Sequence, residues 1–351
     1  MILTSGFIRE VRANFPSARI TLVCSPLAYP LVELCPYVNE VLTFDIKALS
    51  EDFPEMLGKI AVFCRDNLWQ KKFSLAFSPL CGGKSFPGLV MMWLSGARER
   101  VGYISFNHDR AINSFLLNNV INLTGNLIAQ ADKMFHILTS SGLKVNQNHM
   151  ELFYGAEDVR RAKELLEEMP PDCKKIILGL GAGDANRKYP VKKYLVALKK
   201  LAKRDLAFVI IGGKSEADDA NFIEQNLPQG KVLNLAGKTT LRETEAVIAQ
   251  ADYYIGNVTG MMHMAAAAKV PLLTIYREAV DRENVAPSAF SEYLNFPPWQ
   301  TKSVVLRPEH PLGDCATLPP CYGHCHHKEA HCITQITPQQ IIDGFEKLTT
   351  L

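Results

Sequence analysis

The sequence predicts an α/β protein built from two doubly wound, Rossmann-like domains. Short β-branched runs alternate with helix-like runs along most of the chain, and this alternation is typical of a parallel sheet covered by helices. Glycine-rich turns follow several of the apolar runs, as they do in such sheets. A length of 351 residues favours two domains, because one ordinary core rarely grows so large.

The first half alternates predicted helices with predicted strands. Helix-like spacing covers residues 7–14 and 51–70, and strands are predicted at 19–24, 40–45 and 74–78.

The second half repeats this alternation after the double proline Pro170-Pro171, which predicts the domain boundary. Helices are predicted at 157–168, 191–203, 216–226, 241–250 and 262–269, and strands at 175–180, 206–211, 232–235, 253–255 and, as the last strand, 272–276. The predicted domains are therefore 1–170 and 171–336. A closing helix at 337–351, begun by Thr337 and Pro338, is expected to pack back on the first domain.

Composition excludes several classes of protein. The net charge of +2 gives no case for nucleic acid as a main partner. No stretch approaches the ~20 apolar residues that a membrane span needs, and the first residues lack the pattern of a signal peptide. Five scattered cysteines are interpreted as reduced thiols, which predicts a cytoplasmic protein; they are Cys24, Cys35, Cys64, Cys81 and Cys173.

Three glycine turns follow predicted strands of the second half, at residues 179–183, 212–216 and 258–260. Ligands of doubly wound sheets bind at such turns, although simple chain reversal explains any single one equally well. The turn at 258–260 precedes an alanine-rich helix, whose free N-terminal amides suit a phosphate. His263 lies in the first turn of that helix, so we expect a neutral imidazole that donates to a ligand oxygen; the alternative is a histidine that only fills a gap.

Two segments carry a resemblance to a known family: Asn234 to Glu243, and Ala251-Asp252 with Gly256-Asn257-Val258-Thr259-Gly260-Met261-Met262-His263. They resemble glycosyltransferase family 9, the heptosyltransferase-like enzymes of lipopolysaccharide core synthesis. Weaker matches at residues 12–18, 35–41, 96–103 and 186–190 extend the resemblance over most of the chain. The implied fold is the glycosyltransferase B type, in which the two domains face a cleft and the nucleotide-sugar binds the C-terminal one.

The resemblance implies inverting transfer of a sugar, for instance heptose, from a nucleotide-sugar, with an ADP-sugar favoured. It implies no metal cofactor, a saccharide or lipid-linked acceptor, and peripheral contact with the inner membrane. Arg187 would stabilise the leaving phosphate, and Glu216 would face the ribose or base. The residues expected to line the donor diphosphate are Ala182, Gly183, Thr259, Gly260, Met261 and His263.

The sequence departs from the family pattern at two places. Val258 stands where the family has an aspartate before Thr259. The family's first strand and its glycine–aspartate turn, which holds the candidate general base, would precede Met1. No general base is found in this chain, so we expect the native product to begin ~10–20 residues upstream. These departures keep a non-catalytic sugar-nucleotide binder as the alternative function; a nucleotide-sugar epimerase is favoured less.

A tail rich in cysteine and histidine precedes the closing helix. Thiolates and imidazoles at short spacing are typical of a structural metal site. The spacing also permits disulfides or reduced thiols in a packed loop, and it does not choose among the three. The candidate ligands are Cys315, Cys321, Cys325 and Cys332.

Overall fold

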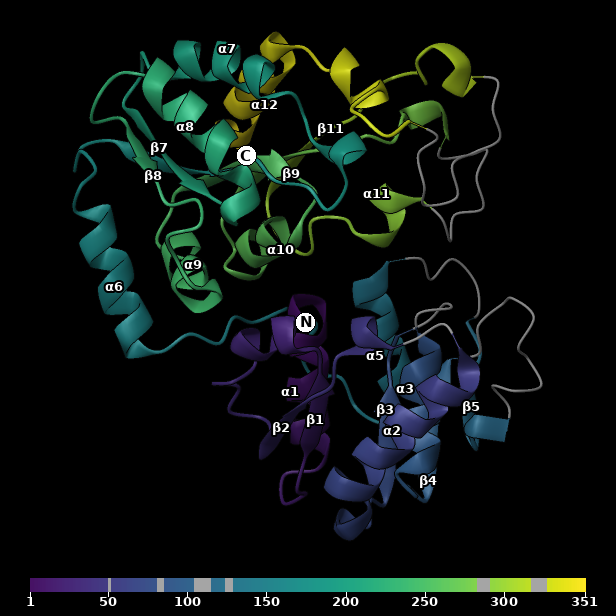
Figure 1. Cartoon of the computed structure of the whole chain (residues 1–351). Helices are drawn as coiled ribbons and strands as arrows, with labels where there is room; N and C mark the ends of the chain where they lie inside the picture. Colours follow the sequence, from purple (N-terminus) through teal and green to yellow (C-terminus); the bar gives the residue numbers. More distant parts are fainter. Residues whose placement is uncertain (50–51, 81–84, 104–114, 124–128, 283–290, 317–326) are drawn as a thin grey trace. The chain divides into compact units, whose positions relative to one another are not determined.

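The computed structural model describes the chain apart from residues 50–51, 81–84, 104–114, 124–128, 283–290 and 317–326 (Figure 1). It divides into two compact units, Leu3–Asn148 and His149–Leu351. The boundary between the units therefore lies earlier in the chain than the double proline, where the sequence predicts it. Helix α6 (Ala156–Leu166) accordingly belongs to the second unit. The reason is packing, because α6 lies against α9 (Leu241–Ile248) of that unit.

The first unit contains two separate parallel sheets in its described residues. Strand β1 pairs with β2, while β3, β4 and β5 form the second sheet in that order. The prediction that a strand upstream of Met1 completes this domain stays a prediction. The strands are β1 (Thr21–Cys24), β2 (Glu40–Thr43), β3 (Leu75–Ser78), β4 (Glu99–Tyr103) and β5 (Asn119–Ile121), and the helices are α1 (Ser5–Asn14), α2 (Phe53–Asn67), α3 (Phe86–Leu94) and α5 (Gln130–Ser140).

The second unit is built on one parallel sheet with the strand order β11-β10-β9-β6-β7-β8. Strand β7 reads Leu-Ala-Phe-Val-Ile-Ile and is buried along its whole length, as expected for a strand covered on both faces. The strands are β6 (Lys174–Gly179), β7 (Leu206–Ile211), β8 (Val232–Asn234), β9 (Tyr253–Asn257), β10 (Leu272–Ile275) and β11 (Ser303–Leu306).

Helices cover both faces of this sheet (Figure 1). Helices α7, α8 and α12 lie on one face and supply much of the unit's core, while α9 and α10 lie on the other. The remaining helices are α7 (Val191–Leu201), α8 (Ala217–Asn226), α10 (Gly260–Ala267), α11 (Glu292–Asn295) and α12 (Pro338–Thr350). Short 3-10 helices that concern the site lie at Ala185–Arg187, Lys214–Glu216, Gly313–Ala316 and Cys332–Gln335.

One prediction about the C-terminal region was wrong. The strand at 272–276 is not the last one, because the short β-branched run Ser303–Leu306 adds β11 beside β10. The closing helix α12 packs on α7, β10 and β11 of its own unit, where Ile341, Phe345 and Leu348 are buried. Its packing on the first domain stays a prediction. Its apolar stripe completes the core of the second unit.

Among the helices in the described ranges, none combines the length and the apolar character that crossing a membrane requires.

Candidate active site

The predicted turns of the second unit meet at one edge of its sheet. Strands β9, β6 and β7 are parallel neighbours, so the turns that follow them leave the same edge side by side. These are the turns at 180–184, 212–216 and 258–259. The turn after β10, at 276–278, leaves the same edge and was not singled out from the sequence.

Asn257 ties the turn after β6 to the end of β9. Its amide nitrogen donates to the carbonyl oxygens of Leu180 and Gly181, at 2.9 and 3.0 Å. Its amide oxygen accepts from the backbone N–H of Tyr189 at 3.2 Å and from the hydroxyl of Tyr194 at 3.3 Å. Because Asn257 is fully buried, these four contacts fix the backbone of the first glycine turn.

A pair of glycines makes room for a buried tyrosine beneath this turn. Gly179 and Gly256 are partners in neighbouring strands, and Tyr254 lies between them. A Cβ atom at Gly179 would lie 2.1 Å from the Tyr254 hydroxyl oxygen, and one at Gly256 would lie 2.5 Å from it. A larger residue at either position would therefore have to displace the tyrosine ring. The strands directly beneath the candidate site are thus tightly packed.

The N-terminus of α10 opens at this edge. Thr259 is its N-cap residue, but the threonine side chain makes no capping hydrogen bond. Gly260 is exposed, and nothing lies within 4 Å of where its Cβ atom would be. The first amides of α10 are therefore available to an anion, and the helix dipole favours one there. Met261 is partly exposed at the same turn.

His263 stands in the first turn of α10, as predicted. Its ring lies edge-on to Phe296, with 6.3 Å between the ring centroids. Burial lowers the pKa of His263 below its ordinary range, so the imidazole is neutral at neutral pH. In the described part of the chain, its buried Nδ1 atom has no hydrogen-bond partner. This nitrogen thus has unused hydrogen-bonding capacity, and the donation of His263 to a ligand oxygen stays a prediction.

Glu216 has a structural role that the sequence did not predict. Its carboxylate accepts from the backbone N–H of Gly213 at 2.7 Å and from the hydroxyl of Ser215 at 2.8 Å. A Cβ atom at Gly181 would lie 3.0 Å from the Glu216 carboxyl carbon, so the turns after β6 and β7 are in close contact. A contact of Glu216 with a ribose stays a prediction.

The remaining residues of the first glycine turn are accessible. Ala182 is partly exposed, and Gly183 is exposed with nothing within 4 Å of its Cβ position. The backbone of Gly183 is therefore open, and the approach of these two residues to a diphosphate stays a prediction.

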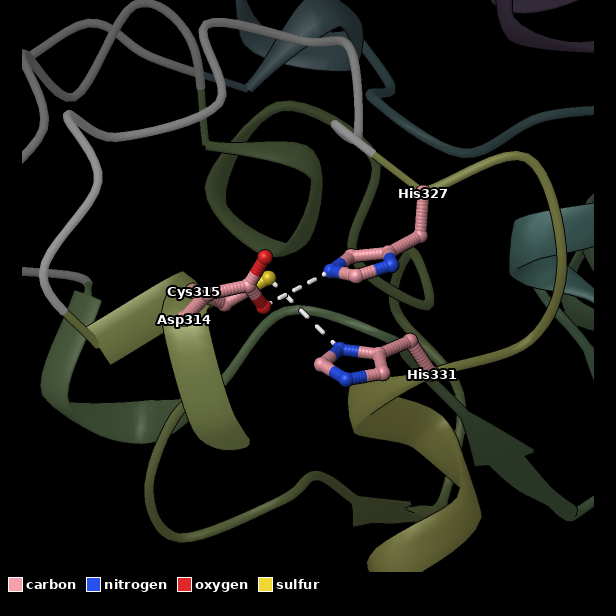
Figure 2. A group of neighbouring side chains, drawn as sticks. All are labelled: Asp314, Cys315, His327 and His331. Carbon is pink, nitrogen blue, oxygen red and sulfur yellow. Dashed lines mark hydrogen bonds and ion pairs between the residues drawn. The ribbon is translucent and has the colours of Figure 1, made fainter.

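The structure brings together two of the four predicted tail cysteines. The Sγ atoms of Cys315 and Cys332 each lie 3.6 Å from Nδ1 of His331 (Figure 2 shows the contact of Cys315). Both side chains are thiols. Cys321 and Cys325 lie outside the described residues.

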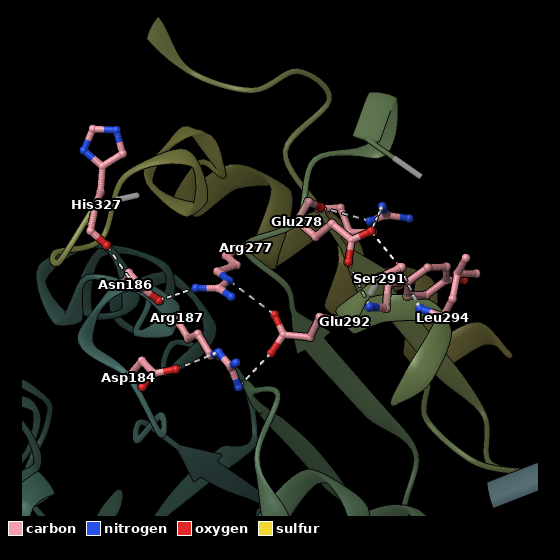
Figure 3. Close-up of polar contacts among 11 residues, drawn as sticks. Asp184, Asn186, Arg187, Arg277, Glu278, Ser291, Glu292, Leu294 and His327 are labelled. Atoms are coloured by element: carbon pink, nitrogen blue, oxygen red, sulfur yellow. Dashed lines mark hydrogen bonds and ion pairs between the residues drawn. The ribbon is translucent and has the colours of Figure 1, made fainter. Parts of the chain in front are cut away.

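Arg187 follows the first glycine turn and forms ion pairs with two carboxylates (Figure 3). Its Nε atom lies 3.2 Å from Oδ2 of Asp184, and its Nη1 atom lies 3.2 Å from Oε1 of Glu292. The side chain of Glu292 is only 10% exposed, and burial raises its pKa while Arg187 and Arg277 oppose that rise. Arg187 is 31% exposed, so part of its guanidinium remains open to solvent.

Arg277 extends this network along the sheet edge. It lies 3.6 Å from Glu292 and donates a hydrogen bond to the side-chain oxygen of Asn186. Asn186 in turn donates to the carbonyl oxygen of His327 at 2.9 Å, which links the network to the cysteine–histidine tail (Figure 3).

Helix α11, which carries Glu292, is anchored by Glu278. The hydroxyl of Ser291 donates to Glu278 at 2.6 Å, and the backbone N–H of Tyr293 donates to it at 3.1 Å. The network therefore rests on the turn after β10, where Glu278 lies.

Sequence reasoning missed Asn257, Arg277 and Glu292 as site residues. Asn257 and Arg277 could have been found, since each lies at or just after the end of a predicted strand at the ligand-binding edge. Glu292 could not, because it reaches the site from a short helix that no sequence pattern marks.

Comparisons with known proteins agree with this architecture. The sequence model of glycosyltransferase family 9 (heptosyltransferase) matches residues 91–305, which is more than half of the chain. Lipooligosaccharide heptosyltransferase 2 of Campylobacter jejuni is 29% identical over 181 residues, which cover 50% of this chain and 52% of that protein. The match thus spans about half the length of that relative.

Longer matches exist at lower identity. Lipopolysaccharide heptosyltransferase 3 of Escherichia coli is 21% identical over 280 residues, which cover 79% of each chain. The solved structure of E. coli ADP-heptose lps heptosyltransferase II matches with a TM-score of 0.71 at 20% identity and covers 100% of this chain and 95% of that chain. The likeness confirms the predicted α/β fold class of the glycosyltransferase B type. The family model matches more than half of the chain, and the chain has the same fold as the solved heptosyltransferase structure. This chain therefore belongs to glycosyltransferase family 9, the heptosyltransferase family.

Proposed function

We propose that the chain transfers a heptose from an ADP-heptose donor to a saccharide of the lipopolysaccharide core, with inversion at the anomeric carbon. One observation carries the proposal: the open N-terminus of α10 and the turn that leads to Arg187 share one sheet edge, where Asn257 ties that turn to the end of β9. An anionic diphosphate suits this combination of amides and a guanidinium.

The residues at this edge match the demands of a departing nucleoside diphosphate. Negative charge grows on the leaving phosphate as the sugar bond breaks, and preorganised donors stabilise that charge most effectively. Arg187 would exchange the exposed carboxylate of Asp184 for the phosphate and keep its contact with Glu292. His263 would donate to a phosphate oxygen from its neutral ring.

We propose that no metal ion takes part in the transfer itself. Arg187 and the α10 amides supply positive charge where a metal would otherwise neutralise the diphosphate. Adding Mg²⁺ or Mn²⁺ is therefore expected to leave kcat unchanged.

The names of the matched relatives support the proposed donor and acceptor. The matched E. coli structure is that of an ADP-heptose enzyme, and the matched relatives act in lipopolysaccharide or lipooligosaccharide synthesis by name. A lipid-linked core saccharide is thus the proposed acceptor. It would bring a cytoplasmic enzyme to the inner membrane face as a peripheral protein.

A non-catalytic sugar-nucleotide binder is the second candidate function. Val258 favours it, because an apolar side chain stands next to Thr259 at the α10 N-terminus, where an aspartate is expected. The two candidates share donor binding and differ in turnover.

Calorimetry followed by a transfer assay tests both candidates. ADP is expected to bind more tightly than UDP, GDP or CDP. His263→Ala should weaken ADP binding by roughly 10- to 100-fold, the equivalent of a lost hydrogen bond to a charged group at roughly 1.5–3 kcal/mol. His149→Ala is the control, since that histidine pairs with Glu151. Tight ADP binding without heptose transfer would favour the binder, and no binding of any nucleotide would exclude both.

A further inference from the structure

The cysteine–histidine tail contains a cluster of potential metal ligands outside the set of residues proposed for the transfer. Asp314 and Cys315 lie on the short helix Gly313–Ala316, while His327 and His331 approach from the segment before Cys332–Gln335 (Figure 2). Each residue offers one ligand atom, and the four atoms all lie within 4.8 Å of one another. Two stretches of chain thus bring four donors to one point.

The contacts within the cluster are those of donors that face a common centre. Sγ of Cys315 lies 3.6 Å from Nδ1 of His331, and Nε2 of His327 lies 3.0 Å from Oδ1 of Asp314. The two imidazole rings are stacked, with 3.7 Å between centroids and 16° between planes. Stacking presents the rings to the thiol and the carboxyl group at the same time.

The backbone supports this arrangement from both sides. Gly313 has a φ angle of +55°, a left-handed conformation that glycine adopts readily, and it turns the chain into Asp314 and Cys315. On the other side, the backbone N–H and the hydroxyl of Thr334 both donate to the carbonyl oxygen of His331, at 2.9 and 2.6 Å. Such second contacts hold ligands in place.

We propose that Asp314, Cys315, His327 and His331 bind one divalent transition-metal ion, and that Zn²⁺ is the ion this donor set prefers. Zinc in structural sites takes four ligands from thiolate, imidazole and carboxylate groups in a tetrahedron. A thiolate and a carboxylate together balance the charge of a divalent cation, and the imidazoles bind it as neutral ligands.

The site joins the tail to the network around Arg187. The carbonyl oxygen of His327 accepts a hydrogen bond from Asn186, the immediate neighbour of Arg187. Arg277 contacts both Asn186 and Glu292, and Glu292 pairs with Arg187 (Figure 3). A metal ion that fixes His327 would therefore hold the chain beside Arg187 in place. Only this last consequence rests on the proposed function.

Elemental analysis of the reduced, purified full chain tests the site without any nucleotide. We expect about one zinc ion per chain. Cys315→Ser and His331→Ala should each lose the ion, while Cys173→Ser and His149→Ala should keep it. Circular dichroism checks that the variants remain folded, and Asp314→Asn provides a milder change if one of them unfolds.

A cobalt-substituted sample gives an independent signal. Thiolate-to-cobalt charge-transfer absorption is expected in the wild type and in Cys173→Ser, and it should be absent in Cys315→Ser. A chain that carries no stoichiometric metal as purified, and takes up neither Zn²⁺ nor Co²⁺, would overturn the proposal. So would a disulfide between Cys315 and Cys332, or loss of the ion in Cys332→Ser but not in Cys315→Ser. One equivalent of iron with the same variant pattern would support the site and overturn the choice of zinc.

Discussion

Arg187 is held by carboxylates of two different kinds. Asp184 is exposed and belongs to the same turn, whereas Glu292 is nearly buried and comes from α11. An exposed ion pair contributes little and is easily exchanged, while a buried carboxylate keeps its partner in position. The arginine can therefore meet a phosphate without leaving Glu292.

We expect Arg187→Lys to lower kcat for heptose transfer by about 10²-fold while ADP affinity changes less, because in the proposed role the guanidinium faces charge that develops only on the leaving group. Lysine keeps a positive charge near Glu292, which limits the loss of stability. Steady-state kinetics with a melting curve separates the two effects. Arg160→Lys on the exposed face of α6 is the control. If the melting temperature falls and kcat does not, the assigned role is wrong.

At the scale of elements, the packing of α6 on α9 buries an ionisable group. Glu245 on α9 is fully buried, and burial raises its pKa to about 8. Nearby, Arg242 of α9 lies 3.3 Å from Asp158, whose carboxylate accepts from the N–H of Gly155 at the start of α6. Asp158 thus has partners that balance its charge, whereas Glu245 is favoured in its neutral form.

The raised pKa predicts that stability falls as pH rises. Between about pH 4.5 and 8 the folded chain keeps a proton on Glu245 that the unfolded chain has released. Unfolding then becomes easier by up to about 1.4 kcal/mol per pH unit from this group. Urea unfolding of the wild type at several pH values in this window should show an unfolding free energy that decreases as pH rises. Glu245→Gln should remove the part of this decrease that comes from Glu245. The exposed Glu168→Gln is the control. An unchanged slope in Glu245→Gln would show that the buried carboxyl does not titrate there.

At the scale of the whole molecule, the two units have separate cores. One core of the first unit gathers residues of α2 and α3, while that of the second unit gathers α7, α8 and α12 around the sheet. The last helix of the chain therefore stabilises the second unit directly.

Phe345→Ala in α12 should destabilise the second unit by about 3–5 kcal/mol, because it leaves a cavity beside Tyr253 in a filled core. Amide hydrogen exchange, followed separately for each strand, tests this expected loss of stability. Protection should fall in β6, β7 and β10 and persist in β3 and β4. The exposed Phe53→Ala in the first unit is the control. Equal loss of protection in both units would contradict separate cores.

The fold class, the family and the sheet edge of the candidate site can all be predicted from the amino-acid sequence. These follow from local patterns: buried strands are continuous apolar runs, and glycine turns follow them at the carboxyl ends. His263 and Arg187 could be singled out because each lies within a few residues of such a turn. The open N-terminus of α10 could be expected for the same reason.

Contacts between segments that lie far apart in the sequence become visible only in the folded chain. Glu292 reaches Arg187, Glu216 closes its own turn, and α12 packs on β10 and β11. The tail offers the clearest example, since Cys315 lies beside His327 and His331, which come from a later stretch of the chain. Side-chain partners of this kind are chosen by packing and by the need to pair buried polar groups, and neither is encoded in local spacing.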